Sequence, residues 1–317
     1  MNRRASVALL LGLPIAMRDA AGAQELSTIR VLGPANDGFK SVYYGVKSGI
    51  FQKYGLEVVP QLVNSGAAAT AALIGGAAEV ASVNVVTVFQ AHLKDVPMKI
   101  ISAAYWYKSE TANTLMLVLK DSPIRSGRDL IGKTVGGPAL GDLASVATLA
   151  WVDQTGGDSK RTSAIEVPQS ATVAFLEQGR VDAVTMNEPA VSQALASGKV
   201  RVLAKPLDAI ATHFEGGCFA VMEPVVEKSF NAMSRFARAM YESVTYTNAH
   251  MAETVDLVAG YSGVPAEVVA KSIRAVDPEY VEARNLQPVI DALAKYGVLA
   301  RHFPAADVIS SAALKVR

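Results

Sequence analysis

The chain has 317 residues, of which 50% are hydrophobic and 19% are charged, and its formal net charge at pH 7 is +1. This composition excludes an intrinsically disordered chain, and the small net charge gives no electrostatic reason to expect a nucleic-acid partner. The length suits two domains, each large enough to bury its own core.

The first 23 residues have the features of a secretory signal peptide. Arg3 and Arg4 precede a short apolar run, and an A-x-A cleavage site occupies residues 21–23. We therefore expect export to the periplasm by the general secretory route, with an uncleaved anchor and a twin-arginine signal as the alternatives. Cys218 is the only cysteine, so no intramolecular disulfide can form and no lipid anchor is expected at the cleavage site.

Hydrophobic periodicity and turn residues predict alternating strands and helices in the mature chain. Strands are expected at residues 28–32, 57–62, 79–83 and 98–104, with helices at 39–50, 67–74 and 85–93 between them. A second series has strands at 114–119, 165–167, 183–186 and 200–204, a helix end that runs into a strand at 129–135, and helices at 143–154, 171–178 and from 188. A strand at 217–222 and helices at 225–230, 232–249, 251–261, 265–273 and 286–296 follow. This order predicts an α/β protein with parallel sheets covered by helices on both faces.

One fourteen-residue pattern occurs twice, at a constant offset of 103 residues. The sequence AALIGGAAEVASVN spans residues 71–84, and AFLEQGRVDAVTMN spans residues 174–187. Each copy predicts a helix end, a glycine stop, an acidic turn residue and a strand that ends on an asparagine, Asn84 or Asn187. Ligands of open α/β sheets bind beyond the carboxyl ends of the strands, so two such ends facing each other predict a cleft between two similar lobes.

Further motifs resemble one family. These are GIFQKYGLEV at residues 49–58, Ser65-Gly66 before an alanine-rich helix, DLIGK at 129–133, and GRVDA at 179–183 followed by Glu188-Pro189. They resemble periplasmic substrate-binding proteins of the nitrate/sulfonate/taurine (NMT1/THI5-like) class. The resemblance implies a type II periplasmic-binding-protein fold, with two mainly parallel sheets in two lobes joined by a two-strand hinge. Lobe 1 would comprise residues 24–107 and 222–317, and an inserted lobe 2 residues 108–221.

The resemblance implies that the protein is the extracytoplasmic solute-binding component of an ABC importer. Its partners would be a small-molecule ligand, such as a sulfonate, carboxylate or pyrimidine-like solute, and a membrane permease; we expect a monomer without a cofactor. The ligand-binding residues that the resemblance implies at matching positions, together with two aromatic residues at the predicted crossing, are Asn36, Phe39, Lys40, Ser65, Gly66, Ala67, Asn84, Tyr105, Trp106, Gly137, Leu140, Gly141, Asp142, Asn187 and Glu188.

The charge of the ligand stays open at this point. Helix N-termini at Gly66 and Gly141 favour an anionic group, because free backbone N–H groups and the helix dipole meet there. Asp142 and Glu188 place negative charge in the same region, which leaves room for a ligand with amine or amide donors.

Several of these residues have a purely structural alternative. Ser65 is a plausible helix cap, and the two asparagines are plausible turn residues that bond their own backbone. Trp106 would then pack in the hinge. Lys40 would be a solvated charge on a helix face, and Glu188 would cap the helix that follows it.

No catalytic or metal-binding motif is present in the sequence. The four histidines lack the spacing of zinc ligands, and neither a G-x-S-x-G motif nor a phosphate-binding P-loop occurs. An enzyme of the THI5-like pyrimidine-precursor class is the alternative on the same fold, although the single Cys218 departs from the cysteine-rich motif of that group. A ligand-sensing domain for a receptor is a further alternative.

Overall fold

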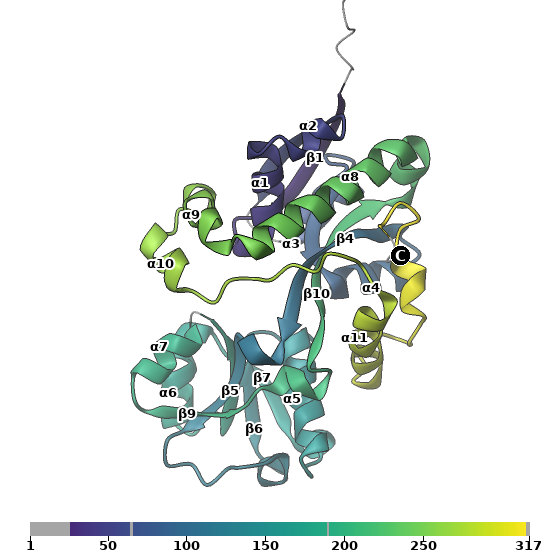
Figure 1. Ribbon diagram of the computed structural model, residues 1–317. Helices are drawn as coiled ribbons and strands as arrows, with labels where there is room; N and C mark the ends of the chain where they lie inside the picture. The colour runs from purple at the N-terminus through teal and green to yellow at the C-terminus, as the bar shows by residue number, and fades with distance from the viewer. Residues whose placement is uncertain (1–25, 64–65, 189, 315–317) are drawn as a thin grey trace, which may run out of the picture.

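The computed structural model describes residues 26–63, 66–188 and 190–314, and it contains two five-stranded sheets, one in each lobe (Figure 1). The first sheet has the strand order β2-β1-β3-β10-β4. Its strands are β1 (Ser27–Pro34), β2 (Leu56–Val63), β3 (Val80–Asn84), β4 (Met98–Lys108) and β10 (His213–Met222). All of its strands are parallel except β10, which is antiparallel to β3 and β4.

The second sheet repeats this arrangement, with the order β7-β6-β8-β5-β9. Its strands are β5 (Thr114–Leu119), β6 (Thr134–Gly137), β7 (Ser163–Glu166), β8 (Ala183–Asn187) and β9 (Val200–Ala204). Here β5 is the antiparallel strand, and it pairs with β8 and β9. The α/β class with two mainly parallel sheets is therefore confirmed, and each sheet has one antiparallel strand in the position next to its edge.

Helices cover both faces of the first sheet. They are α1 (Lys40–Lys47), α2 (Ile50–Lys53), α3 (Gly66–Ile74), α4 (Val85–Leu93), α8 (Glu223–Ala249), α9 (Val255–Ser262), α10 (Ala266–Lys271) and α11 (Ala283–Lys295). On one face, Phe236 and Met240 of α8 pack with Phe219 of β10 in a single apolar cluster. On the other, Phe89 of α4 and Leu286 of α11 share a cluster with strand residues. Two such layers are what a sheet that is apolar on both faces requires.

The second sheet is covered by α5 (Leu143–Gln154), α6 (Thr172–Glu177) and α7 (Ala190–Ala196). The helix α5 also packs toward the first lobe, because Val146 lies in the same apolar cluster as Leu286. The Tyr296 hydroxyl, just after α11, donates to Asp153 Oδ2 at 2.7 Å. The lobes thus touch along this side of the molecule.

The repeated pattern folds into the same turn in both lobes. Gly76 and Gly179 have φ angles of 74° and 68°, which only glycine adopts without strain. In each copy the acidic residue then forms two hydrogen bonds with the backbone of the neighbouring strand. Glu79 accepts a hydrogen bond from Arg30 N at 2.8 Å and its own N–H donates to Arg30 O. Asp182 makes the same two bonds with Thr134.

The repeat therefore fixes strand register in both sheets, since each carboxylate satisfies a backbone donor where two parallel strands begin.

Two antiparallel strands connect the lobes (Figure 1): β4 runs from the first lobe toward the second, and β10 runs back. They pair from Met98 opposite Met222 to Lys108 opposite His213. The strand β10 pairs within the first sheet along its whole length, from His213 to Met222. The exact lobe boundaries and the hinge motion stay predictions.

Most predicted elements are present, and the differences have local causes. The predicted helix 39–50 is divided into α1 and α2, because Gly49 has a φ angle of 79°. The helices predicted at 225–230 and 232–249 are joined in α8 with a kink at Ser229. Within the described ranges, no helix combines the length and the apolar character needed to cross a membrane. The predicted signal peptide lies outside those ranges.

Candidate functional site

The strand directions bring the carboxyl edges of the two sheets to face each other. The strand β4 runs toward the second lobe, and β3 is parallel to it because both are antiparallel to β10. In the second lobe β5 leads away from the first lobe, so the antiparallel β8 runs back toward it. The ends of β3 and β8, Asn84 and Asn187, therefore lie on the facing edges, as the repeat predicts. Such edges are where open α/β sheets bind ligands.

Both asparagines use the side-chain oxygen within the protein. Asn84 Oδ1 accepts from Val86 N at 2.9 Å and so caps α4. Asn187 Oδ1 accepts from Thr114 Oγ1 at 2.8 Å, across the pair of strands β8 and β5. Neither Nδ2 group donates to another residue of the described ranges. Among the described residues, each edge thus presents an amide N–H₂ group that has no acceptor.

The turn after β1 forms another part of the first edge. Asn36 caps a short helix, η1 (Asp37–Phe39), by accepting from Gly38 N at 3.1 Å. Tyr261 donates to the carbonyl of Asn36 at 2.8 Å and holds the turn from α9. The ring of Phe39 is fully buried beneath this turn and packs against Phe219. Phe39 therefore supports the edge and does not face it.

The interpretation of Lys40 as a solvated helix-face charge is wrong, because its side chain is 0% exposed. Lys40 Nζ donates to Asp277 Oδ2 at 3.0 Å and to the carbonyl of Ala275 at 2.8 Å. Asp277 also accepts from Ser41 Oγ at 2.5 Å. Burial raises the pKa of Asp277 to about 6, although Lys40 and Ser41 favour its ionised form. This pair ties the segment before α11 to α1, beneath the turn.

At the second edge, the glycine-rich turn after β6 leads into α5. Gly141 has a φ angle of 75°, and Asp142 then caps α5 by accepting from Ser145 N at 2.7 Å. Partial burial raises the pKa of Asp142. The predicted anion-binding N-terminus of α5 is thus already bonded to a carboxylate of its own chain. Leu140 is 53% exposed, and Gly137 ends β6.

Glu188 caps the start of α7, as its structural alternative predicts. Its carboxylate accepts from Ser192 N at 3.1 Å and from Ser192 Oγ at 2.9 Å. The carboxylates of Glu188 and Asp142 therefore both accept hydrogen bonds from the first turns of α7 and α5. These bonds reduce the repulsion that an anionic ligand would meet.

Two aromatic residues lie where the strands cross between the lobes. The Tyr105 hydroxyl donates to Asn113 Oδ1 at 3.3 Å, and burial raises the pKa of Tyr105. Trp106 is half-buried, and its backbone N–H donates to Val276 O at 3.2 Å. The segment between α10 and α11 passes across the crossing strands there (Figure 1). Gly66 and Ala67, both exposed, begin α3, while Ser65 lies outside the described residues.

Sequence reasoning missed Glu215, which pairs with Trp106 across β10 and β4. The side chain is 0% exposed, and neither carboxylate oxygen has a hydrogen-bond partner. The signal that could have revealed it is a single charged residue in the otherwise apolar stretch between Phe214 and Val221.

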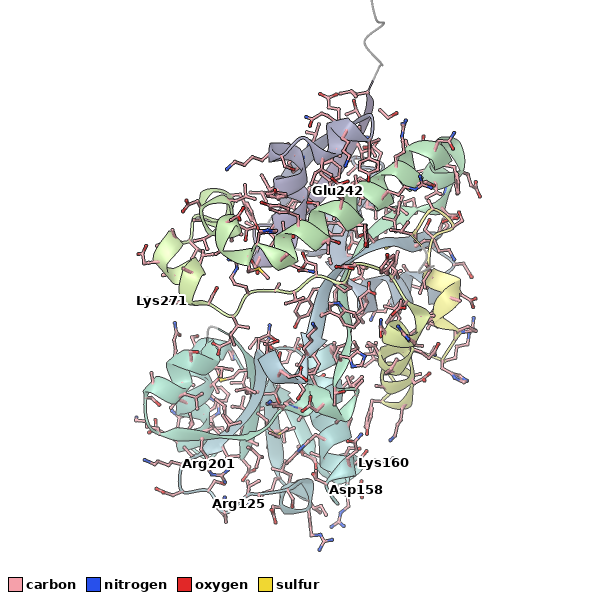
Figure 2. All side chains as sticks on the ribbon, in the orientation of Figure 1. Arg125, Asp158, Lys160, Arg201, Glu242 and Lys271 are labelled. Atoms are coloured by element: carbon pink, nitrogen blue, oxygen red, sulfur yellow. The ribbon has the colours of Figure 1, made fainter. Side chains whose placement is uncertain are left out.

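Two hollows of about 430 Å³ each lie elsewhere on the described surface. One lies between Ser122 and Asp182 at the end of the second lobe away from the first, near Arg125 in Figure 2; the other is beside α11. No cluster of metal-ligating side chains occurs within the described ranges. Cys218 is fully buried, and burial raises the pKa of its thiol. Its side chain is therefore not exposed at either sheet edge.

Comparisons with known proteins agree with this architecture. A family model described as NMT1/THI5 like matches residues 36–254. The putative aliphatic sulfonates-binding protein of Escherichia coli (strain K12) is 28% identical over 176 residues, which are 55% of this chain and 53% of that protein. The chain thus spans about half the length of this curated relative.

Two solved structures show the same fold. The periplasmic aliphatic sulphonate binding protein SsuA from Escherichia coli superimposes with a TM-score of 0.72 at 19% identity, over 92% of this chain and 94% of that one. The alkanesulfonate-binding protein SsuA from Xanthomonas axonopodis pv. citri, bound to MOPS, gives 0.62 at 17% identity, over 90% and 98%. The fold is that of periplasmic binding proteins. Because the family model matches more than half of the sequence, the chain belongs to the NMT1/THI5-like family.

Proposed function

We propose that the protein is the extracytoplasmic solute-binding component of an ABC-type importer and captures a small organic anion or an oxygen-bearing heterocycle between its lobes. The observation that carries this proposal is the pair of free amide groups, Asn84 Nδ2 and Asn187 Nδ2, at equivalent ends of β3 and β8. Two donors from opposite lobes can bond the same acceptor group, and such a group stabilises the arrangement in which the lobes are close.

The chemistry of the edges favours oxygen acceptors. Amide N–H₂ groups donate to sulfonate, carboxylate or carbonyl oxygens, and hydrogen bonds to charged groups are stronger than those between neutral groups. The exposed Leu140 and the half-buried Trp106 offer apolar surface for a carbon skeleton. The named relatives bind aliphatic sulfonates, which supports this ligand class.

A thermal-shift screen of the purified protein tests the proposal. The screen contains alkanesulfonates, aliphatic and aromatic carboxylates, and pyrimidines. A ligand at about 100 times its Kd should add roughly 2.7 kcal/mol to the free energy of unfolding and raise the Tm. Native mass spectrometry then gives the stoichiometry, expected to be one ligand per chain. If no compound in the screen changes the Tm, the proposed function is rejected for these classes.

Replacing the two asparagines separately is expected to weaken binding of the best ligand about tenfold or more. Asn187→Ala removes one donor to a charged group, a contribution of about 1.5–3 kcal/mol. Asn84→Ser is the suitable change at the other edge, because serine still caps α4 but lacks the amide nitrogen. Isothermal titration calorimetry measures the affinities.

The matched control is Asn231→Ala, at an exposed position of α8. It should bind as the wild-type protein does, and all three variants should keep the wild-type circular-dichroism spectrum. Unchanged affinity in both Asn187→Ala and Asn84→Ser would remove the two-edge site.

A further inference from the structure

Two arginine side chains lie together at the end of the second lobe away from the first. Arg125 belongs to the loop that follows β5, and Arg201 belongs to the edge strand β9 (Figure 2). Arg125 Nη1 donates to the carbonyl oxygens of Ser122 and Ile124. Arg201 Nη2 donates to the same two oxygens, at 3.0 Å and 2.6 Å. Two guanidinium groups therefore share two neutral acceptors.

Only one of these arginines is needed to hold the loop. Arg201 joins the loop to β9, since the two carbonyl groups that it bonds are 79 and 77 residues away in the chain. Arg125 bonds carbonyl groups three residues and one residue before it in its own loop, so it attaches the loop to no other element. Its charge nevertheless lies beside that of Arg201, and like charges repel.

Neither arginine has a carboxylate partner. Among the described residues, no Asp or Glu oxygen lies within ion-pair distance of either guanidinium group. Two lysines of the same lobe are balanced: Lys133 pairs with Asp182 at 3.2 Å, and Lys199 pairs with Glu177 at 2.8 Å. The arginine pair is thus a local excess of two positive charges.

Most N–H groups of the pair have no acceptor. Each guanidinium group carries five N–H donors, and among the described residues Arg125 uses only Nη1 and Arg201 only Nη2. Arg201 Nε is buried without a partner. Burial and the charge of Arg125 lower the pKa of Arg201 from its ordinary value. Arg125 is exposed and Arg201 is partly exposed, so a solute in the surrounding water can reach the pair.

The nearby carboxylate of Asp129 is already bonded within the loop. It accepts from the backbone N–H groups of Arg125 and Ser126, at 2.9 Å and 3.0 Å, and from Ser126 Oγ at 3.1 Å. These bonds lower the pKa of Asp129 and keep its charge on the backbone side of the loop. The guanidinium groups therefore remain open to an anion from outside the chain.

We propose that Arg125 and Arg201 form a second binding site, which takes a phosphate-type dianion. Guanidinium groups bond phosphate oxygens through paired N–H donors, and two of them supply the charge that a dianion requires. A bound dianion also removes the repulsion between the arginines. The ligand is free phosphate or the phosphate monoester headgroup of a lipid, since both present the same oxygens.

This site is separate from the facing sheet edges. The strand β5 runs from Thr114, opposite Asn187, to Val118, opposite Arg201. The backbone between these two positions is roughly 13 Å long. Binding at the arginine pair therefore does not depend on the proposed function of the sheet edges.

Calorimetry with inorganic phosphate on the full mature chain tests the proposal, with sodium chloride used to keep the ionic strength constant. The wild-type protein should bind phosphate, and Arg125→Gln should weaken this binding tenfold or more. Because Arg125 bonds only its own loop, the variant should keep the wild-type Tm in phosphate-free buffer. Phosphate should raise the Tm of the wild-type protein but not that of Arg125→Gln.

The matched control is Lys160→Gln, which makes the same change of charge at an exposed position of the second lobe (Figure 2). It should bind phosphate as the wild-type protein does. An equal loss of affinity in Lys160→Gln and Arg125→Gln would show an effect of net charge alone and reject the site.

Asn187→Ala separates this site from the one between the lobes and should keep the wild-type affinity for phosphate. If phosphate binding is lost in Asn187→Ala and unchanged in Arg125→Gln, phosphate binds at the sheet edges. That result rejects the arginine site and leaves the proposed function standing.

Vesicles distinguish the two sources of the phosphate group. Phosphatidylcholine vesicles with and without phosphatidic acid are sedimented with the protein. Association that requires phosphatidic acid and is lost in Arg125→Gln identifies a lipid headgroup as the ligand. Binding of inorganic phosphate without association with either vesicle identifies the free anion. Absence of both kinds of binding rejects the second site.

Discussion

Replacing Lys40 with methionine is expected to lower the free energy of unfolding by about 3–5 kcal/mol, because it leaves the buried Asp277 carboxyl without its cation. Both side chains of this pair are almost fully buried, at 0% and 1% exposure. A loss of this size is a large fraction of the 5–15 kcal/mol that stabilises a typical domain. Urea unfolding followed by circular dichroism measures it.

The control for this variant is Lys53→Met. Lys53 bonds Glu242 of α8, which is labelled in Figure 2, at 2.8 Å, but the Lys53 side chain is 64% exposed. Solvent screens such a pair, so its loss should cost less than about 1 kcal/mol. An equal decrease in the free energy of unfolding in the two variants would contradict the importance of burial for the Lys40 pair.

The Lys40→Met variant should also respond to pH in a defined direction. Asp277 has a folded pKa of about 6 against an ordinary value of 3.8, and removing Lys40 raises the folded value further. The folded state then binds more protons than the unfolded state between these values, so stability rises as pH falls through the folded pKa. The difference in the free energy of unfolding between wild type and Lys40→Met should therefore be smaller at pH 5 than at pH 8. A second change, Asp277→Leu, should recover part of the loss at pH 8.

Replacing Gly127 with alanine should destabilise the protein by about 3 kcal/mol or more. Gly127 begins the short helix η3 (Gly127–Leu130), packed against α5. A Cβ atom there would lie 2.1 Å from the carbonyl oxygen and 2.6 Å from the Cα of Val152. Overpacking commonly costs about 1–3 kcal/mol, and here the clash is with helix backbone, which cannot move aside as a side chain can.

Gly260→Ala is the matched control. Gly260 lies in α9, and a Cβ atom there would have no neighbour within 4 Å. Alanine favours a helix over glycine by up to about 1 kcal/mol, so this variant should be as stable as wild type or slightly more stable. Urea unfolding measures the free energies of unfolding of both variants. A Gly127→Ala protein within about 1 kcal/mol of wild type would contradict the predicted clash.

Local patterns in the sequence were enough to predict most elements. The helix expected at 143–154 is α5, and the strand expected at 200–204 is β9. The repeated pattern also predicted correctly that Asn84 and Asn187 end equivalent strands. These predictions depend on caps, glycine stops and alternation of apolar residues, which act over a few residues and so can be read along the chain.

Features that depend on distant partners could not be predicted in this way. Lys40 and Asp277 are 237 residues apart, and nothing near Lys40 in the sequence indicates that α1 would be covered by the segment before α11. Glu215 lies outside the strand predicted at 217–222, whereas pairing with β4 buries it at the crossing between the lobes.

The sequence by itself thus determined the duplicated strand and helix units and the asparagines at the ends of β3 and β8, because these follow from interactions between near neighbours. The tertiary structure alone decided which charges are buried, which are paired, and which, like Glu215, are left without a partner. The reason is physical: burial and pairing of a side chain are set by whatever the fold packs against it, and in this protein those contacts come from elements more than 100 residues away.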